Sequence, residues 1–155
     1  MKSKKQAAKQ EPLSKDRLRL WLRLLKLTRE TEARLRERLK AEFNTTLPRF
    51  DVMAALSRYE TGLKMSQLSG VLRVSNGNVT GIVDRLAEEG VVVRVPVPGD
   101  RRAALVRLTK RGRQLFEIQA AAHEAWISEL LEDFDAEETS VMIERLTAFA
   151  IEDEV

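Results

Sequence analysis

Cysteine is absent from this chain of 155 residues, and histidine occurs once, as His123. The missing thiol excludes disulfides, thiolate nucleophiles and cysteine-ligated zinc or iron–sulfur sites. One histidine is too few for a histidine-based metal site, and we find no further ligands to place around it. Neither an HExxH motif nor a glycine-rich phosphate loop followed by lysine is present. We therefore expect no cofactor, no metal and no enzymatic activity.

Long apolar runs are missing too, and glycine and proline are scarce. No segment approaches the ~20 apolar residues that cross a bilayer, and the basic start of the chain has no apolar core behind it, unlike a secretory signal. We expect a cytoplasmic protein with no membrane partner. Hydrophobic residues make up 43% of the chain, with only 7 glycines and 4 prolines. This composition is typical of a folded domain.

Charge is plentiful but unevenly distributed along the chain. The formal net charge is +9 over residues 1–40, −1 over 41–90, +5 over 91–120 and −10 over 121–155. Two basic segments raise the local concentration of polyanions, which favours nucleic acid as a partner. The alternative is that the acidic end neutralises the basic start within one fold or one dimer.

The first 45 residues predict an arm and a long helix. Residues 1–12 have no apolar period, so we expect a disordered basic arm or a solvated tail without a specific role. A helix is predicted from an N-cap at Ser14 to about Ala41, within an N-terminal dimerisation segment over 13–45. Its leucines form two stripes, whereas a surface helix needs one. We expect a second subunit to cover the extra stripe.

Residues 46–109 predict a DNA-binding domain that begins with one helix. Thr46 is placed to cap that helix, and Pro48 lies in its first turn, where the missing N–H costs nothing. Gly62 is predicted to end it. Phe50, Met53, Ala54 and Leu56 give this helix a core face.

Two short helices joined by a tight turn follow, which is a helix-turn-helix. We expect Ser66 to cap the first and Ser75 to cap the second, which runs over residues 76–89 and ends at Gly90. The buried face of the second helix follows the i, i+3, i+4, i+7 spacing. It consists of Val79, Ile82, Val83 and Leu86.

The hydrophobic period then changes from helical to two. Residues 91–95 and 104–108 alternate as β-strands do, and the Pro- and Arg-containing segment 96–102 between them predicts a long charged tip. A hairpin in this position is a wing. Residues 110–155 predict C-terminal dimerisation helices, the first capped by Thr109 and the last opened by a capping box at Asp135 and Glu138.

The order of these elements resembles the MarR family of bacterial transcriptional regulators over about residues 13–152. The most specific segments are Ser75–Leu86, Gly90, the wing sequence Asp100-Arg101-Arg102 and Leu108-Thr109. The resemblance implies a mainly α fold with a small β-wing, a winged helix-turn-helix between long N- and C-terminal dimerisation helices. It also implies a homodimer on palindromic operator DNA, with repression usually relieved by a small ligand.

The DNA contacts are predicted on two elements. The outer face of helix 76–89 carries short polar side chains and one arginine, which suit base edges in the major groove. Serines at helix starts and Arg94 on the first strand of the hairpin suit phosphate, and the tip arginines Arg101 and Arg102 suit the minor groove. We expect Asp100 to hold an arginine by an ion pair, as the resemblance also implies. The predicted DNA-binding residues are Ser66, Ser75, Asn76, Gly77, Asn78, Thr80, Arg85, Arg94, Asp100, Arg101 and Arg102. The alternatives are capping and turn chemistry, or a solvated loop.

A basic stripe on the first helix suggests an effector site. Arg19, Arg23 and Lys26 lie within about 40° of one another on a helical wheel and are flanked by leucines. This pattern suits an anionic amphiphile, such as an aromatic carboxylate or an acyl-CoA thioester, and the resemblance implies aromatic acids. The predicted ligand-binding residues are Arg19, Trp21, Arg23, Lys26, Phe50, Met53 and Tyr59. The alternatives are a solvated or partner-paired stripe, and plain core for the apolar members.

The sequence thus predicts a dimeric repressor of double-stranded DNA that a small anionic aromatic effector releases. The same basic surfaces also fit an alternative function, that of an architectural protein that coats or bends DNA without an inducer. Without cysteine, thiol-based peroxide sensing is excluded. His123 either lines the effector site or is an interface residue.

Overall fold

The computed structural model describes residues 12–72 and 76–149. The predicted fold class is confirmed, because helices dominate and a small antiparallel sheet forms the wing. The elements are α1 Leu13–Phe43, α2 Leu47–Ser57, β1 Leu63–Lys64, α3 Met65–Leu72, α4 Asn76–Glu88, β2 Val92–Val97, β3 Asp100–Leu108, α5 Lys110–Leu130 and α6 Ala136–Thr147. Within the described ranges, no helix has the length and apolarity that a bilayer crossing requires.

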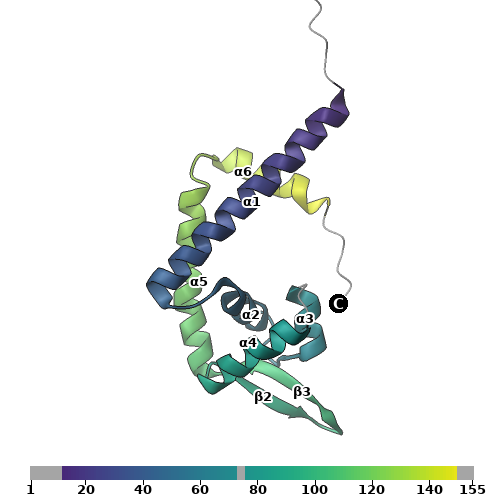
Figure 1. Ribbon diagram of the computed structural model, residues 1–155, viewed down its shortest axis with the longest axis vertical. Helices are drawn as coiled ribbons and strands as arrows, with labels where there is room; N and C mark the ends of the chain where they lie inside the picture. Colours follow the sequence, from purple (N-terminus) through teal and green to yellow (C-terminus); the bar gives the residue numbers. More distant parts are fainter. Residues whose placement is uncertain (1–11, 73–75, 150–155) are drawn as a thin grey trace, which may run out of the picture.

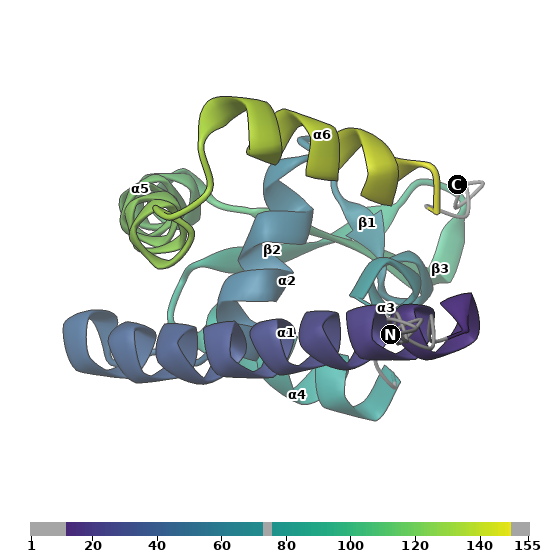
Figure 2. The ribbon, with the colours of Figure 1, turned by 90° about the horizontal axis from the view of Figure 1, so that it is seen from above.

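The long helices form an open frame above the DNA-binding domain (Figure 1). The C-terminal part of α1 packs against α2 and α5, whereas its N-terminal part extends away from them. Helices α1 and α6 overlap in Figure 1, but Figure 2 shows them on opposite sides of the molecule, with α5 seen end-on at one side. No residue of α6 is buried. A single chain therefore leaves these two helices without a packing partner along most of their length.

One hydrophobic cluster ties the frame to the domain below it. Its buried members are Leu35, Leu39, Leu47, Phe50 and Trp126, which come from α1, α2 and α5. At its edge, the Arg38 guanidinium donates to both carboxylate oxygens of Glu129, at 2.8 and 2.9 Å. This bidentate pair lowers the pKa of the Glu129 carboxyl below its ordinary value. It joins α1 to α5 above the domain.

The second cluster is the core of the winged helix-turn-helix. It gathers apolar side chains of α2, α3, α4 and the sheet, among them Leu56, Leu68, Val83 and Val106. The strands are ordered β1-β3-β2, and all pairs are antiparallel. This core fixes α4 against the base of the hairpin.

Three predicted helix caps are confirmed. The Thr46 hydroxyl accepts a hydrogen bond from the N–H of Arg49, and the Thr109 hydroxyl accepts one from the N–H of Gly112. Asp135 and Glu138 form both hydrogen bonds of a capping box. These caps lie within three residues of their partners, so the local sequence determines them.

Two predicted caps are wrong. Helix α1 begins at Leu13, one residue before Ser14, and no side-chain cap is formed there. Helix α3 begins at Met65, so Ser66 lies inside its first turn. Strand β1 ends at Lys64, directly before α3, and the Gln67 side chain accepts the Lys64 N–H at 3.0 Å. Pairing of β1 with β3 therefore sets where α3 begins.

The predicted role of Gly62 as the end of the preceding helix is also wrong. Helix α2 ends at Ser57, five residues earlier. Gly62 has φ +99°, and a Cβ there would lie 2.7 Å from the carbonyl oxygen of Val106. The glycine is required by the turn into β1, where the chain passes close to the backbone of β3.

Candidate nucleic-acid interface

Helix α4 has one buried face and one exposed face. Val79, Val83 and Leu86 are almost fully buried, while Ile82 is partly buried, so the predicted apolar stripe is confirmed. The helix packs against α2, α3 and β2. Its exposed residues include Asn78, Thr80, Gly81, Asp84 and Arg85. Burial of the apolar stripe therefore turns the short polar side chains outward.

The predicted contacts before Asn78 are only partly described. Ser75 lies outside the described residues. Asn76 and Gly77 belong to the first turn of α4, but their side chains fall outside the description. Ser66 is exposed in the first turn of α3. Its role as a cap is wrong, but its role as a phosphate contact stays a prediction.

The wing is tighter than predicted. The long charged tip is wrong, because β2 continues to Val97 and β3 already starts at Asp100. The turn between them is Pro98-Gly99, with Gly99 at φ +82°, and a register shift at Pro96 absorbs the proline. Pairing thus extends through residues whose composition resembles a loop, and the hairpin projects from the body (Figure 1).

Both arginines of the wing sequence lie on β3, not in a loop. Arg101 and Arg102 are exposed. The Asp100 carboxylate accepts a hydrogen bond from the backbone N–H of Arg102 at 3.0 Å. The expected ion pair from Asp100 to an arginine is not formed within the part of the chain that the structure describes. Asp100 therefore stabilises the turn and leaves both guanidinium groups available.

An ion pair connects the wing to α4. The Arg94 guanidinium of β2 donates to the Asp84 carboxylate of α4 at 2.5 Å. A second ion pair joins Arg49 of α2 to Glu89, just beyond the end of α4. Sequence reasoning assigned Arg94 to phosphate and gave Asp84 no role. Together the two pairs hold α4 relative to the wing and to α2.

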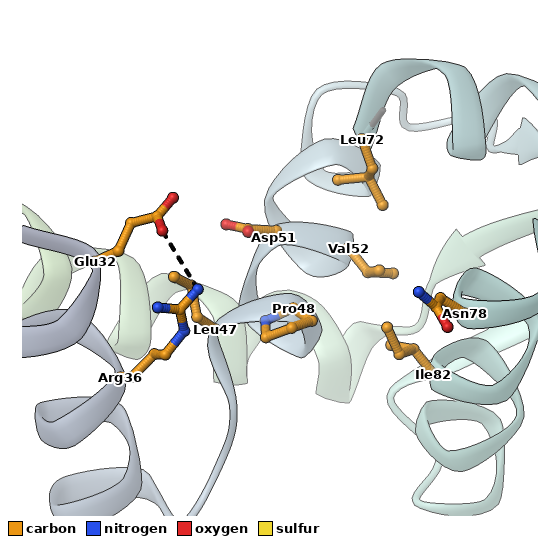
Figure 3. Close-up of a pocket in the computed structure, with 9 residues that line it drawn as sticks. All are labelled: Glu32, Arg36, Leu47, Pro48, Asp51, Val52, Leu72, Asn78 and Ile82. Carbon is orange, nitrogen blue, oxygen red and sulfur yellow. Dashed lines mark hydrogen bonds and ion pairs between the residues drawn. The ribbon is translucent and has the colours of Figure 1, made fainter. Parts of the chain in front are cut away.

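A cavity of about 380 Å³ lies between α1, α2, α3 and α4. Figure 3 shows charged side chains of α1 and α2 at one end and apolar side chains of α2, α3 and α4 at the other. It is lined by Glu32, Arg36, Leu47, Pro48, Asp51, Val52, Leu72, Asn78 and Ile82. Asn78 and Ile82 belong to α4, so the cavity wall includes the helix predicted to read DNA.

The residues predicted to bind an effector fall into two separate groups. Arg19, Trp21, Arg23 and Lys26 are exposed on the N-terminal part of α1; Arg19 pairs with Asp16 at 3.0 Å and Lys26 with Glu30 at 3.7 Å. Phe50 and Met53 are buried in the two cores, and Tyr59 is partly buried against the second. Within one chain, the structure does not bring the two groups together.

Sequence reasoning missed the charged residues of the cavity. Glu32 and Arg36 are spaced i, i+4 and pair at 3.3 Å, a signal visible in the sequence. Asp51 is a carboxylate within the otherwise apolar segment Phe50–Leu56. That isolated charge was the available signal for a functional position.

Asp51 and the single histidine influence each other across α2 and α5. Burial raises the pKa of the Asp51 carboxyl above its ordinary value, and the charge of His123 opposes that rise. Burial lowers the pKa of His123, and Asp51 opposes that change. The His123 ring stacks on Phe50, with centroids 4.7 Å apart. His123 therefore lies beside the junction of frame and domain.

Comparison with known proteins points to one family. The family model described as MarR family matches residues 45–104. A MarR family transcriptional regulator from Silicibacter pomeroyi is 33% identical, with TM-score 0.73 over 90% of this chain and 96% of that one. A cysteine-to-serine mutant of MarR from E. coli, complexed with operator DNA, is 25% identical, with TM-score 0.75 over 90% and 99%.

Curated relatives match over shorter segments. The transcriptional activatory protein BadR of Rhodopseudomonas palustris is 38% identical over 92 residues, which are 57% of this chain and 53% of BadR. The HTH-type transcriptional regulator PecS of Dickeya dadantii is 28% identical over 66% of this chain and 63% of PecS. The chain thus spans between half and two thirds of these two relatives. All four of these similar proteins are transcriptional regulators, not enzymes.

Proposed function

The chain belongs to the MarR family of DNA-binding transcriptional regulators, and from this premise we propose that it is a homodimeric repressor of a palindromic operator. One observation supports this proposal most: the polar face of α4 is exposed beside a projecting wing with two exposed arginines. Helix α4 then enters the major groove, where Asn78 and Thr80 meet base edges and Arg85 meets guanine or phosphate. Arg101 and Arg102 enter the adjacent minor groove.

The proposed dimer accounts for the exposed apolar side chains of the frame. Trp21 is 56% exposed, Leu146 is 53% exposed and Phe149 is 83% exposed. Large apolar surfaces of this kind mark protein–protein interfaces. Further exposed members are Leu13, Leu18, Leu20, Leu22, Val141, Met142 and Ile143. A second copy that packs α1 and α6 against their counterparts buries this surface and places two α4 helices on one duplex.

The proposed effector is a small anionic aromatic molecule, an aromatic carboxylate or its CoA thioester, held by the basic stripe of α1. The exposed cations Arg19, Arg23 and Lys26 beside exposed leucines support this chemistry. The double variant Arg19→Ala with Arg23→Ala should blunt release by the effector before it weakens DNA binding. Release that survives this change rules out the stripe as the site.

Selection from random duplex DNA tests the function itself. We expect enrichment of one inverted repeat, with half-sites about one helical turn apart, and affinity that falls steeply with salt. Uniform coating without an enriched sequence favours the architectural alternative instead. Because BadR is named an activatory protein, a transcription assay on the enriched site must measure whether the protein lowers or raises transcription. Increased transcription overturns the assignment as a repressor.

A further inference from the structure

A second cavity, of about 300 Å³, lies where the ends of α1 and α4 meet α2 and α5. It shares no lining residue with the cavity of Figure 3. Its lining consists of Phe43, Asn44, Thr45, Arg49, Met53, Leu86, Glu89, Leu115 and Gln119. The volume is at the lower end of the range of small-molecule sites. A molecule about the size of one substituted ring therefore fits.

Two polar atoms in the wall of this second cavity lack a partner. Gln119 of α5 is only 3% exposed, and its Oε1 accepts no hydrogen bond from any described residue. The buried Nε–H of Arg49 on α2 likewise finds no acceptor in the described part of the chain. Buried polar atoms that stay unpaired cost free energy, so proteins rarely leave them so. The wall thus offers one acceptor and one donor to whatever fills the cavity.

The charges of the lining compensate each other. Arg49 and Glu89 are its charged members, and the Nη2 of Arg49 donates to the Glu89 carboxylate. A charged ligand therefore meets no unpaired opposite charge and loses its hydration, which disfavours both cations and anions. The apolar part of the lining consists of Phe43, Met53, Leu86 and Leu115. The cavity suits a neutral molecule with an apolar body.

We propose that this second cavity binds a small neutral aromatic carboxamide. The amide N–H donates to Oε1 of Gln119, and the amide carbonyl accepts from Nε of Arg49. The ring replaces water against Leu86 and Leu115. This site goes beyond the proposed function, because none of the basic residues of the α1 stripe lines it and its ligand carries no charge.

Two probes of nearly the same shape isolate the hydrogen bond to Gln119. Benzamide and acetophenone carry the same ring and a carbonyl, but only benzamide has N–H donors. Isothermal titration of the full chain should give saturable binding of benzamide, at least about tenfold tighter than that of acetophenone. Equal affinities overturn the proposal. Absence of saturable benzamide binding also overturns it, and means that water satisfies the two polar atoms.

Matched variants on α5 locate the site. Gln119→Met keeps an unbranched side chain of similar size but removes the acceptor, so benzamide should bind about tenfold more weakly and no better than acetophenone. Gln114→Met makes the same change at an exposed position of α5 outside the cavity lining, and should bind both probes as the wild type does. A preference for benzamide that survives Gln119→Met overturns the assignment.

A second variant keeps the test decisive if Gln119→Met does not fold. Arg49→Lys retains the positive charge beside Glu89 but lacks Nε, so both probes should bind more weakly by a similar factor, because both carbonyls lose their donor. Arg58→Lys makes the same change at an exposed position outside the lining and should have no effect. Unchanged affinities in Arg49→Lys overturn the proposal. The titrations contain no DNA, so their failure leaves the proposed function intact.

Discussion

Charged side chains around α4 and the wing fall into two groups. Some form ion pairs that hold α4 in place within the chain, and others remain available to contact DNA. Arg94 is paired with Asp84, and Arg49 is paired with Glu89. Among the described residues, the Arg102 side chain instead has no partner, and the Asp100 carboxylate accepts a hydrogen bond from its backbone N–H. A charged side chain contributes most to DNA affinity when DNA is its only strong partner. Arg102 is therefore the wing residue whose removal is most informative.

Arg102→Ala should lower operator affinity by at least about tenfold and flatten its dependence on salt, because each subunit loses one cation from the DNA interface. Anisotropy titrations at several salt concentrations measure both effects. Arg34→Ala removes an equal charge from the exposed surface of α1, outside the predicted DNA contacts, and should leave the affinity near that of the wild type. Equal affinities for Arg102→Ala and the wild type would remove the wing from the mechanism.

Asp51→Asn should raise stability at pH 7, because the partial burial that raises the pKa of the Asp51 carboxyl penalises its charge, and the amide carries none. The folded-state pKa of Asp51 lies above its ordinary value, so its cost is present at higher pH and disappears as pH falls below the unfolded pKa. The gain in the free energy of unfolding is at most about 1 kcal/mol, since water reaches the carboxylate. As pH falls, protonation of His123, which faces Asp51 from α5, stabilises the charged carboxylate of the wild type. This reduces the stability difference between the wild type and Asp51→Asn.

Thermal unfolding at fixed protein concentration across this pH range checks the prediction, with Glu117→Gln as the control for a lost surface charge. A stability difference between Asp51→Asn and the wild type that grows toward acid pH contradicts the expected sign. The charged neighbours Glu32 and Arg36 of α1 stay unchanged in both proteins.

Among the elements, α5 is placed by a close approach to the wing. Gly112 lies in its first turn, where a Cβ would lie 2.0 Å from the carbonyl oxygen of Val91 and 3.2 Å from the Leu108 side chain. The Thr109 hydroxyl also donates to the carbonyl oxygen of Gly90 at 2.6 Å. The start of α5 thus rests on the turn between α4 and β2. Any side chain at position 112 has to push these elements apart.

Gly112→Ala should lower the free energy of unfolding by about 1–3 kcal/mol, as overpacking against backbone does. Gly70→Ala is its matched control, because Gly70 lies in α3 with nothing within 4 Å of an added Cβ. That variant should be as stable as the wild type or more stable by up to about 1 kcal/mol. Urea unfolding measures the stability of both variants. Equal free energies of unfolding for Gly112→Ala and Gly70→Ala would show that α5 can move away from Val91 at no cost in stability.

Elements were predictable from the sequence where their signals are local. The stripe of Val79, Val83 and Leu86 predicted α4, and Thr46 and Thr109 predicted two helix starts, because each signal spans only a few residues. Strand β1 was not predicted, since its two residues are strands only through pairing with β3. The same long-range pairing is why the predicted cap at Ser66 was wrong.

The candidate site was predictable in part for the same reason. The polar face of α4 follows from the period of its apolar stripe. The Asp84–Arg94 pair depends on how the hairpin folds back beside α4. The cavity depends on four helices meeting around Asp51. Neither arrangement has a short-range signal, so only the packed structure shows them.

For the whole molecule, the decisive feature is a frame that a single chain does not complete. Helix α6 has no buried residue, and the N-terminal part of α1 stands apart from the body. Large apolar side chains on both helices, and Phe149 just beyond the end of α6, remain exposed. Desolvation of such side chains is worth about 25 cal/mol per Å². The proposed dimer would close the frame and fix the distance between two copies of α4.

Leu146→Glu should shift the protein toward monomers and weaken operator binding together, because a charge replaces an apolar side chain in the proposed dimer contact. Ser140→Glu places the same charge on α6 about 120° away around the helix and should leave the dimer intact. Light scattering coupled to size-exclusion chromatography measures the mass. A Leu146→Glu protein that stays dimeric excludes this face of α6 from the interface.

The most direct test of the proposed DNA-binding mode is chemical footprinting of the wild-type protein on its selected operator. Methylation of guanine N7 reports the major groove, and hydroxyl radicals report access to the sugars along the minor groove. We predict two symmetric patches of N7 protection about one helical turn apart, from two α4 helices, with minor-groove protection on their outer sides from the two wings. A single patch, or continuous protection along the duplex, would contradict this binding mode.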